Sequence, residues 1–272
     1  MPSLLESDLK QRVLEENRRL HALENARYLD RHPEQTNRYQ QRILRQTLSE
    51  WDRLLARPQA QLLEAGCGTG YLYLPLLQRG YRMTGVDLSD TLIQVLQNRI
   101  PDRHRGRSRL VAADIEAFLK EETSDYDGVI CSALLHHLYD YETVLAELAR
   151  RVRPGGLLLI FFEPLRQTIR SPFRFFLHRR LAGLDERLYT RSMKRRGIPL
   201  IEDGGMADYQ RRFGGLCPDR LAAVVRENGM TVLRTTTYCV RRHAWAAWLA
   251  NQVLGTRNTF NLLARKTQAA GA

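Results

Sequence analysis

The stretch Leu62-Leu63-Glu64-Ala65-Gly66-Cys67-Gly68-Thr69-Gly70 combines an apolar run with three glycines at alternate positions. The apolar start is typical of a buried strand, and the residues after Gly70 favour a helix. Glycine has no Cβ, so the backbone at these positions can turn tightly and approach a ligand closely. The following helix directs its free N–H groups toward the same place. This stretch therefore predicts a strand, a ligand-binding turn and a helix.

From about residue 60 onward, short apolar runs alternate with helical stretches. The expected strands are 61–65, 82–86, 109–112, 126–132, 156–162, 231–240 and 259–266. The expected helices in this region are 72–78, 90–99, 116–121, 141–152, 218–228 and 243–254. Alternation of strand and helix at this spacing predicts an α/β fold, with a parallel sheet covered by helices on both faces.

Acidic residues follow the second and third expected strands. Asp87 ends the second strand, and Asp114 lies in Ala113-Asp114-Ile115 after the third. An acid in the first position can accept hydrogen bonds from a ribose diol, and the second acid can contact an adenine edge. Either acid can instead be a helix N-cap, and a glycine turn can be a simple connection. Together they lie at the sheet edge where parallel sheets bind ligands.

These features occur in the order of the motifs of class I methyltransferases that use S-adenosylmethionine (SAM). The residues that carry the resemblance are Glu64, Gly66, Gly68, Gly70, Asp87, Asp114 and Arg153-Pro154-Gly155-Gly156. The resemblance is close over residues 60–163 and looser in the C-terminal strands. It implies a Rossmann-like, seven-stranded, mostly parallel sheet whose last strand is antiparallel.

The resemblance also implies roles for individual residues. The glycine turn would lie against the methionine part of SAM, and Glu64 would hold its amino group. Asp87 would bind the ribose, and Asp114 with Ile115 the adenine. The residues expected around SAM, and around its product S-adenosylhomocysteine, are Glu64, Gly66, Cys67, Gly68, Gly70, Asp87, Leu88, Asp114, Ile115 and Cys131.

A nicotinamide dinucleotide is the main rival for the glycine turn. Its fingerprint is GxGxxG, whereas here Tyr71 follows Gly70, so the third glycine falls one residue early. The sequence also has one glycine turn and no obvious second mononucleotide unit. These two observations favour SAM.

The fourth strand leads into Cys131-Ser132-Ala133-Leu134-Leu135-His136-His137-Leu138, which resembles the same segment in methyltransferases of ubiquinone and menaquinone biosynthesis. His137, and less favourably His136, is a candidate to remove a proton from an acceptor, since histidine has a pKa of about 6.5. Both histidines can instead be structural, because positioning alone can drive methyl transfer. Cys131 is expected to behave as a small buried hydrophobe rather than as a nucleophile.

The chain is expected to have two parts. Residues 1–57 read as a helical cover, in which Tyr28 and Tyr39 are candidates for closing the SAM pocket. Residues 58–272 read as the SAM-binding domain, interrupted after strand five by a lid-like insertion at 165–215.

The insertion holds twelve Lys and Arg residues against five acids, in a chain with a net charge of +12. The side chains expected on one apolar face of its helix are Phe173, Phe176, Leu177, Leu181 and Leu184. Such a helix can lie on an anionic membrane, cover the acceptor pocket, or present a solvated basic face over a packed stripe. Trp245 and Trp248 raise the same choice between a membrane interface and a packed helix.

The favoured acceptor is a small organic molecule of amphiphilic or lipid-like character. RNA is the rival, although strand four lacks an Asn/Asp-Pro-Pro-Tyr motif and no RNA-binding module is recognisable. A non-catalytic SAM-binding scaffold is a further alternative. The four cysteines form no CxxC pair, so no metal site is expected. With no signal pattern and no long apolar run, a cytoplasmic location is expected, with possible peripheral membrane contact.

Overall fold

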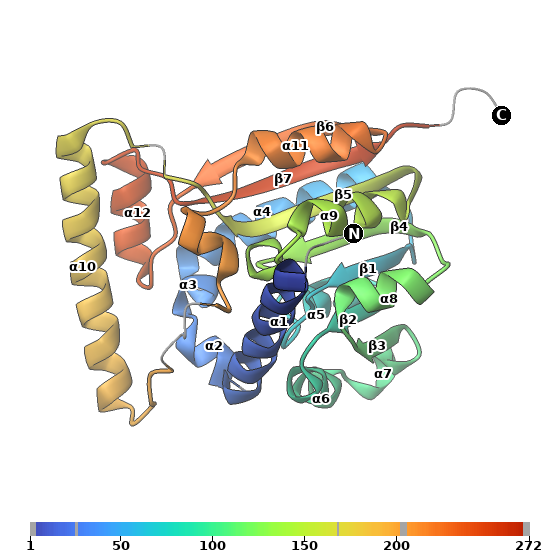
Figure 1. Cartoon of the computed structure of the whole chain (residues 1–272), viewed down its shortest axis with the longest axis horizontal. Coiled ribbons are helices and arrows are strands. Elements are labelled where there is room, and N and C mark those ends of the chain that lie inside the picture. The colour runs from blue at the N-terminus through green and yellow to red at the C-terminus, as the bar shows by residue number, and fades with distance from the viewer. Residues whose placement is uncertain (1–3, 25–26, 168, 202–205, 269–272) are drawn as a thin grey trace.

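A seven-stranded sheet forms the centre of the computed structural model, which describes residues 4–24, 27–167, 169–201 and 206–268 (Figure 1). The strands are β1 Gln61–Ala65, β2 Arg82–Asp87, β3 Ser108–Ala112, β4 Tyr126–Ser132, β5 Val152–Pro164, β6 Met230–Tyr238 and β7 Thr259–Lys266. Their order in the sheet is β3-β2-β1-β4-β5-β7-β6. The first five are parallel, and β7 is antiparallel to both β5 and β6. This confirms the predicted Rossmann-like sheet.

Helices flank the sheet on both sides. They are α1 Leu4–Glu24, α2 Tyr28–Arg31, α3 Pro33–Thr36, α4 Arg38–Leu55, α5 Tyr73–Gln78, α6 Asp90–Arg99, α7 Asp102–Arg105, α8 Ile115–Glu121, α9 Tyr141–Arg150, α10 Pro172–Arg195, α11 Pro218–Glu227 and α12 Ala244–Gln252, with short 3₁₀ turns η2 Leu135–His137 and η3 Tyr209–Phe213. Several begin at a polar cap: Ser89, Asp114 and Asp140 each accept a backbone N–H from the first turn of α6, α8 and α9. Such a cap stabilises a helix by about 1 kcal/mol.

Two apolar cores lie on the two faces of the sheet. One packs α8, α9 and α11 against the strands, and the other packs α4, α5 and α6. Trp51 of α4 is fully buried and lies so close to Gly128 of β4 that a Cβ there would be 2.4 Å from its ring. The N-terminal helices therefore occupy two different positions: α4 covers one face of the sheet, and α1 lies at the carboxyl ends of the strands.

The helix α10 buries a different face from the one that the sequence pattern indicates. Its buried side chains are His178, Leu181, Asp185, Tyr189 and Met193. Of the expected apolar stripe, Leu181 is buried and Leu177 half-buried, whereas Phe173, Phe176 and Leu184 are exposed. Of the three alternatives for this helix, the packed apolar stripe therefore does not describe the structure, since three of its five side chains are exposed.

Polar partners explain which face of α10 is buried. Asp185 accepts hydrogen bonds from the backbone N–H groups of Arg242 and His243, and the hydroxyl of Tyr189 donates to the carbonyl of Arg31. Although α10 is long, none of the helices in the described ranges is apolar enough over sufficient length to cross a membrane.

Candidate active site

A cavity of about 240 Å³ lies at the carboxyl ends of β1, β2, β3 and β4, where the strand order reverses. This is the place where open α/β sheets bind ligands. Residues that follow each of the four strands line the cavity, and α1 forms the facing wall with side chains that include Val13, Asn17 and His21. Tyr28 lines the cavity as well, whereas Tyr39 is not among its lining residues. Figure 1 shows α1 beside these strand ends.

The glycine turn forms the floor of the cavity. Gly66, Gly68 and Gly70 all have positive φ angles, of 69°, 49° and 92°. Gly66 and Gly68 line the cavity, and a Cβ on Gly68 would meet no protein atom within 4 Å. A Cβ on Gly70 would instead lie 2.5 Å from the side chain of Leu96. Gly68 thus leaves space for a ligand, while Gly70 allows α6 to pack closely.

Asp87 links this turn to the end of β2. One carboxylate oxygen accepts the N–H of Gly68 at 2.8 Å, and the other accepts the N–H of Ser89 at 2.9 Å. Burial raises the pKa of Asp87, an effect that nearby His21 and the two amides oppose. Because a carboxylate has about four lone-pair positions, Asp87 can still accept hydrogen bonds from a ligand.

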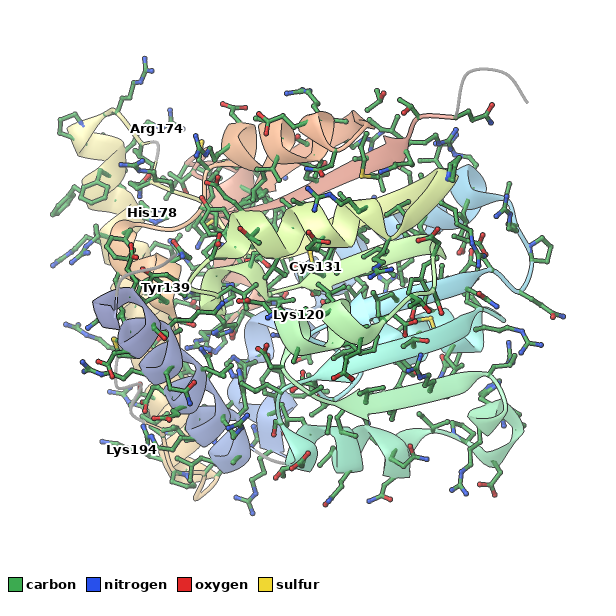
Figure 2. All side chains as sticks on the ribbon, turned by 45° about the vertical axis from the view of Figure 1, so that its right-hand side comes forward. Lys120, Cys131, Tyr139, Arg174, His178 and Lys194 are labelled. Carbon is green, nitrogen blue, oxygen red and sulfur yellow. The ribbon has the colours of Figure 1, made fainter. Side chains whose placement is uncertain are left out.

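The other expected cofactor residues divide into two groups. Leu88, Asp114 and Ile115 line the cavity, and Asp114 also caps α8 through the N–H of Ala117 at 3.0 Å. Glu64, Cys67, Gly70 and Cys131 do not line it. Cys67 and Cys131 are buried, and burial raises the pKa of both thiols well above the ordinary value. Figure 2 shows Cys131 within the sheet and Tyr139, a lining residue, beside α1.

Glu64 lies in β1, two residues before Gly66, with an exposed fraction of 1%. Its Oε2 atom has no hydrogen-bond partner within the described parts of the chain. Burial, and then the charge of Asp87, raise the pKa of Glu64 well above its ordinary value. A buried polar atom of this kind is stabilised by a donor, such as a ligand amine or a water.

His137 lines the cavity, and its hydrogen-bond partner determines which ring nitrogen carries the proton. Nδ1 lies 2.7 Å from the carbonyl oxygen of Ala207, which can only accept, so Nδ1 carries the hydrogen and Nε2 the lone pair. Burial, and then the neighbouring His136, lower the pKa of His137 well below its ordinary value. The ring is therefore neutral near neutral pH. The His21 ring from α1 meets it edge-on at 5.3 Å.

His136 does not line the cavity, and its ring contacts the fully buried carboxylate of Glu163 and the partly exposed carboxylate of Asp208. Its Nδ1 lies 2.8 Å from Oε2 of Glu163, and its Nε2 lies 3.5 Å from Oδ1 of Asp208. Burial lowers the pKa of His136, but the two carboxylates outweigh burial and the net shift is upward. His136 therefore anchors the segment after β4 and does not line the cavity.

Several residues of the site were not predicted from the sequence. Asn17 of α1 donates to the carbonyl of His137 at 3.2 Å, and Lys10 pairs with Glu116 at 2.5 Å, which ties α1 to the cavity edge. Glu163 and Asp208 hold His136. No local pattern marks Asp208, which is an isolated acid in the basic insertion.

Three side chains in this region are close enough together to be considered as metal ligands: ligand atoms of His136, His137 and Asp208 lie within 4.8 Å of one another. Because Nδ1 of His137 donates to the carbonyl of Ala207, only Nε2 of this ring has a lone pair to offer a metal. The insertion reaches the site through Ala207 and Asp208, but no described residue of 165–215 lines the cavity.

Residues 63–160, which carry the glycine turn, Asp87, Asp114 and both histidines, match a family model described as a methyltransferase domain. The chain contains a methyltransferase domain. Ubiquinone biosynthesis O-methyltransferase from Albidiferax ferrireducens is 31% identical to it over 117 residues, which cover 43% of this chain and 44% of the relative. The protein of that name from Coxiella burnetii is 32% identical over 117 residues, 43% of this chain and 47% of the relative. The match thus spans about half the length of these relatives.

Solved structures of similar fold align with most of this chain. The [4+2]-cyclase SpnF has a TM-score of 0.55 at 15% identity, covering 85% of this chain and 83% of SpnF. Magnesium protoporphyrin IX methyltransferase (ChlM) from Synechocystis PCC 6803, with bound S-adenosylhomocysteine, has a TM-score of 0.54 at 17% identity, covering 93% of this chain and all of the other, 100%. At this identity the likeness shows the fold alone, and the cyclase illustrates that one fold serves more than one reaction.

Proposed function

We propose that the protein is a SAM-dependent methyltransferase that acts on a small organic acceptor of amphiphilic or lipid-like character. One observation carries the proposal: Gly66, Gly68 and Asp87 converge on a single cavity within a methyltransferase domain. The names of the relatives do not by themselves establish the activity of this protein, because the match covers about half of each relative.

The cavity has features that fit SAM. Gly68 leaves space where a side chain would stand, and Asp87 retains acceptor capacity for two hydroxyls. Glu64 does not line the cavity, but it lies two residues before Gly66 and has a buried oxygen without a donor. In this proposal Gly66 and Gly68 hold the methionine part, Asp87 the ribose, and Asp114 with Ile115 the adenine. When bound, SAM supplies an electrophilic methyl group.

The chain's own contribution is to orient the acceptor and exclude water. The helix α1 closes one wall of the cavity, and confinement of two reactants in this way accelerates their reaction. His137 offers a neutral ring whose Nε2 lone pair can accept a proton from the acceptor. His136 is better suited to holding the segment that carries His137.

The acceptor is proposed from the relatives, which are named as O-methyltransferases of ubiquinone biosynthesis. Their names favour a phenolic, quinone-like acceptor methylated on oxygen. RNA is less favoured, because the basic charge is concentrated in 165–215 and no described residue of that segment lines the cavity. A cytoplasmic location with peripheral contact to an anionic membrane completes the proposal.

The first test is calorimetric titration of the full chain with SAM and S-adenosylhomocysteine. A methyl-transfer assay then compares phenolic compounds, a metabolite extract and total RNA, with correction for spontaneous hydrolysis of SAM. We expect binding of both nucleosides and a methylated small molecule. Binding without product would favour a non-catalytic scaffold, product from RNA alone would reject the small acceptor, and absence of SAM binding would reject the proposal.

A further inference from the structure

Exposed apolar side chains are concentrated at one end of the molecule. Of the eleven large exposed hydrophobic residues in the described parts of the chain, seven lie on α10, on α12 or directly after α12: Phe173, Phe175, Phe176, Leu184, Trp245, Trp248 and Val253. The exposed fractions of Phe173, Trp248 and Val253 are 69%, 54% and 61%. Single exposed hydrophobic residues are normal on a soluble protein, but a cluster on adjoining elements indicates a binding surface.

The two helices form one surface, although they are far apart in the sequence. The guanidinium of Arg174, near the start of α10, donates to the carbonyls of Leu254 and Gly255 just beyond α12. The carboxylate of Asp185, in the middle of α10, contacts His243 at the start of α12 at 2.7 Å. The helices therefore run antiparallel, side by side. Figure 1 shows both beyond the end of the sheet, and Figure 2 shows Arg174 and Lys194 along α10 at the margin of the molecule.

The aromatic side chains of α10 are interleaved with cations. Residues 170–195 contain eight Arg and Lys residues and two acids, and both acids are engaged, Asp185 with His243 and Glu186 with Arg242. In the described ranges, no ion pair is formed by Arg179, Arg180, Arg187 or Arg191. The helix α12 carries no charge at all. The surface thus combines an aromatic face with uncompensated positive charge.

We propose that the outer faces of α10 and α12 are a docking surface for an anionic lipid membrane. Tryptophan and phenylalanine lie favourably at the level of lipid headgroups, and arginine is attracted to anionic lipids. This proposal identifies the surface and the partner behind the peripheral contact named above. It requires neither SAM binding nor turnover, so it can fail or succeed independently of the proposed activity.

Other occupants fit this surface less well. A second copy docked about a two-fold axis would bring the same unpaired arginines face to face, which is unfavourable. Nucleic acid binding is driven by phosphate contacts along a basic path, whereas α12 exposes Trp245 and Trp248 and contains no cation. An interface that is partly apolar and partly anionic matches both helices.

The test is co-sedimentation of the full chain with vesicles of phosphatidylcholine alone, or of phosphatidylcholine mixed with phosphatidylglycerol. We expect binding to the anionic vesicles only, and weakening of that binding at high salt, because salt screens exposed charges. The variants Phe173→Ser/Phe176→Ser and Trp245→Ser/Trp248→Ser should each weaken vesicle binding by about tenfold or more, a loss corresponding to ~1.4 kcal/mol. Leu233→Ser, at an exposed hydrophobic residue on β6, should leave it unchanged.

A charge-reversal pair completes the design. Arg179→Glu/Arg187→Glu should abolish binding, whereas Arg103→Glu/Arg105→Glu, on α7 away from α10 and α12 (Figure 1), makes the same change in net charge and should retain most of it. Circular dichroism and the thermal unfolding midpoint, measured in parallel, report whether each variant is folded without depending on SAM binding.

The proposal would be overturned if the two double charge-reversal variants lost vesicle binding equally. It would also be overturned if the unaltered chain did not bind anionic vesicles. A dimer, or an RNA complex, that the Phe173→Ser/Phe176→Ser variant disrupts while vesicles remain unbound would overturn it as well. Absence of SAM binding by the unaltered chain, with vesicle binding intact, would reject the proposed methyltransferase activity and leave the docking surface standing.

Discussion

Glu163 and His136 form a buried pair in which the Oε2 and Nδ1 atoms lie 2.8 Å apart. The carboxylate of Glu163 also accepts the backbone N–H groups of Leu134, Leu135 and His136. The end of β5 therefore holds the whole segment that follows β4. The other side of the His136 ring faces Asp208, so the same histidine connects this segment to the insertion.

His136→Gln should destabilise the fold by about 2–4 kcal/mol, because it leaves the fully buried carboxylate of Glu163 without its cation, whereas Asp208 is partly exposed and keeps its ion pair with Arg211. The pKa of His136 is raised in the folded protein, so its stabilising effect is complete below the ordinary value of 6.5 and is lost as the pH rises through the folded value. The free energy of unfolding, measured in urea across this pH range, should differ less between His136→Gln and the unaltered protein at high pH than at low pH. His104→Gln is the control, since the pKa of His104 is lowered; an identical pH trend there would contradict the assignment.

Gly68→Ala should weaken SAM binding by about tenfold or more, because its methyl group would stand in space that the ligand needs. The matched control is Gly197→Ala. Gly197 has a similar φ of 63° and equally open surroundings, and it does not line the cavity. Both variants should lose about 1 kcal/mol of stability from left-handed backbone strain. Calorimetry should separate them, and equal SAM affinities would count against the position assigned to the ligand.

His137→Asn should lower kcat by about 10²-fold or more while the affinity for SAM changes little, if the ring accepts the acceptor's proton. Because the pKa of His137 is lowered well below 6.5, the unaltered enzyme should keep its rate from about pH 8 to about pH 6. Steady-state kinetics across this range is the measurement. His178→Asn, outside the cavity, is the control; an unchanged kcat in His137→Asn would assign this histidine a purely structural role.

Glu34→Gln should loosen the attachment of α3 to the segment before α12. The carboxylate of Glu34 lies 3.0 Å from His32 and 2.6 Å from Arg242. Burial raises the pKa of Glu34, but these partners outweigh burial and lower it to about 2. Its stabilising effect, on the order of 3 kcal/mol, is therefore present above the ordinary pKa of 4.5 and fades as the pH falls toward about 2.

Urea unfolding of Glu34→Gln against the unaltered protein, at neutral and at acidic pH, measures this effect. Asp102→Asn removes an exposed ion pair with Arg105 and should cost less than about 1 kcal/mol at any pH. If the loss of stability in Glu34→Gln is the same at acidic pH as at neutral pH, packing rather than charge is responsible.

The sequence predicted the elements whose signals are local. The expected strands 61–65, 126–132 and 259–266 and the helix 90–99 have the bounds found in the structure, because apolar runs there end at turn or cap residues. The cavity position of Gly68 and Asp87 could also be predicted, since carboxyl ends of parallel strands meet at one edge. Their ligand remains a prediction.

Tertiary contacts decided what the sequence did not predict. The buried face of α10 is selected by partners of Asp185 and Tyr189 that come from distant segments. Likewise, Ala207 determines the proton position on His137 through a backbone carbonyl, which no side-chain pattern encodes. The wall that α1 contributes depends on how a weakly patterned helix docks, and its hydrophobic spacing alone does not specify the partner.

The interior position of β7 has a consequence for the growing polypeptide. β6 pairs with the sheet only through β7, which also covers the free edge of β5. Until residues 259–266 leave the ribosome, β5 exposes an unpaired edge beside its strongly apolar segment 157–161. Such an edge can pair with a neighbouring nascent chain, so the interval before the last strand arrives is when this protein is most prone to aggregate.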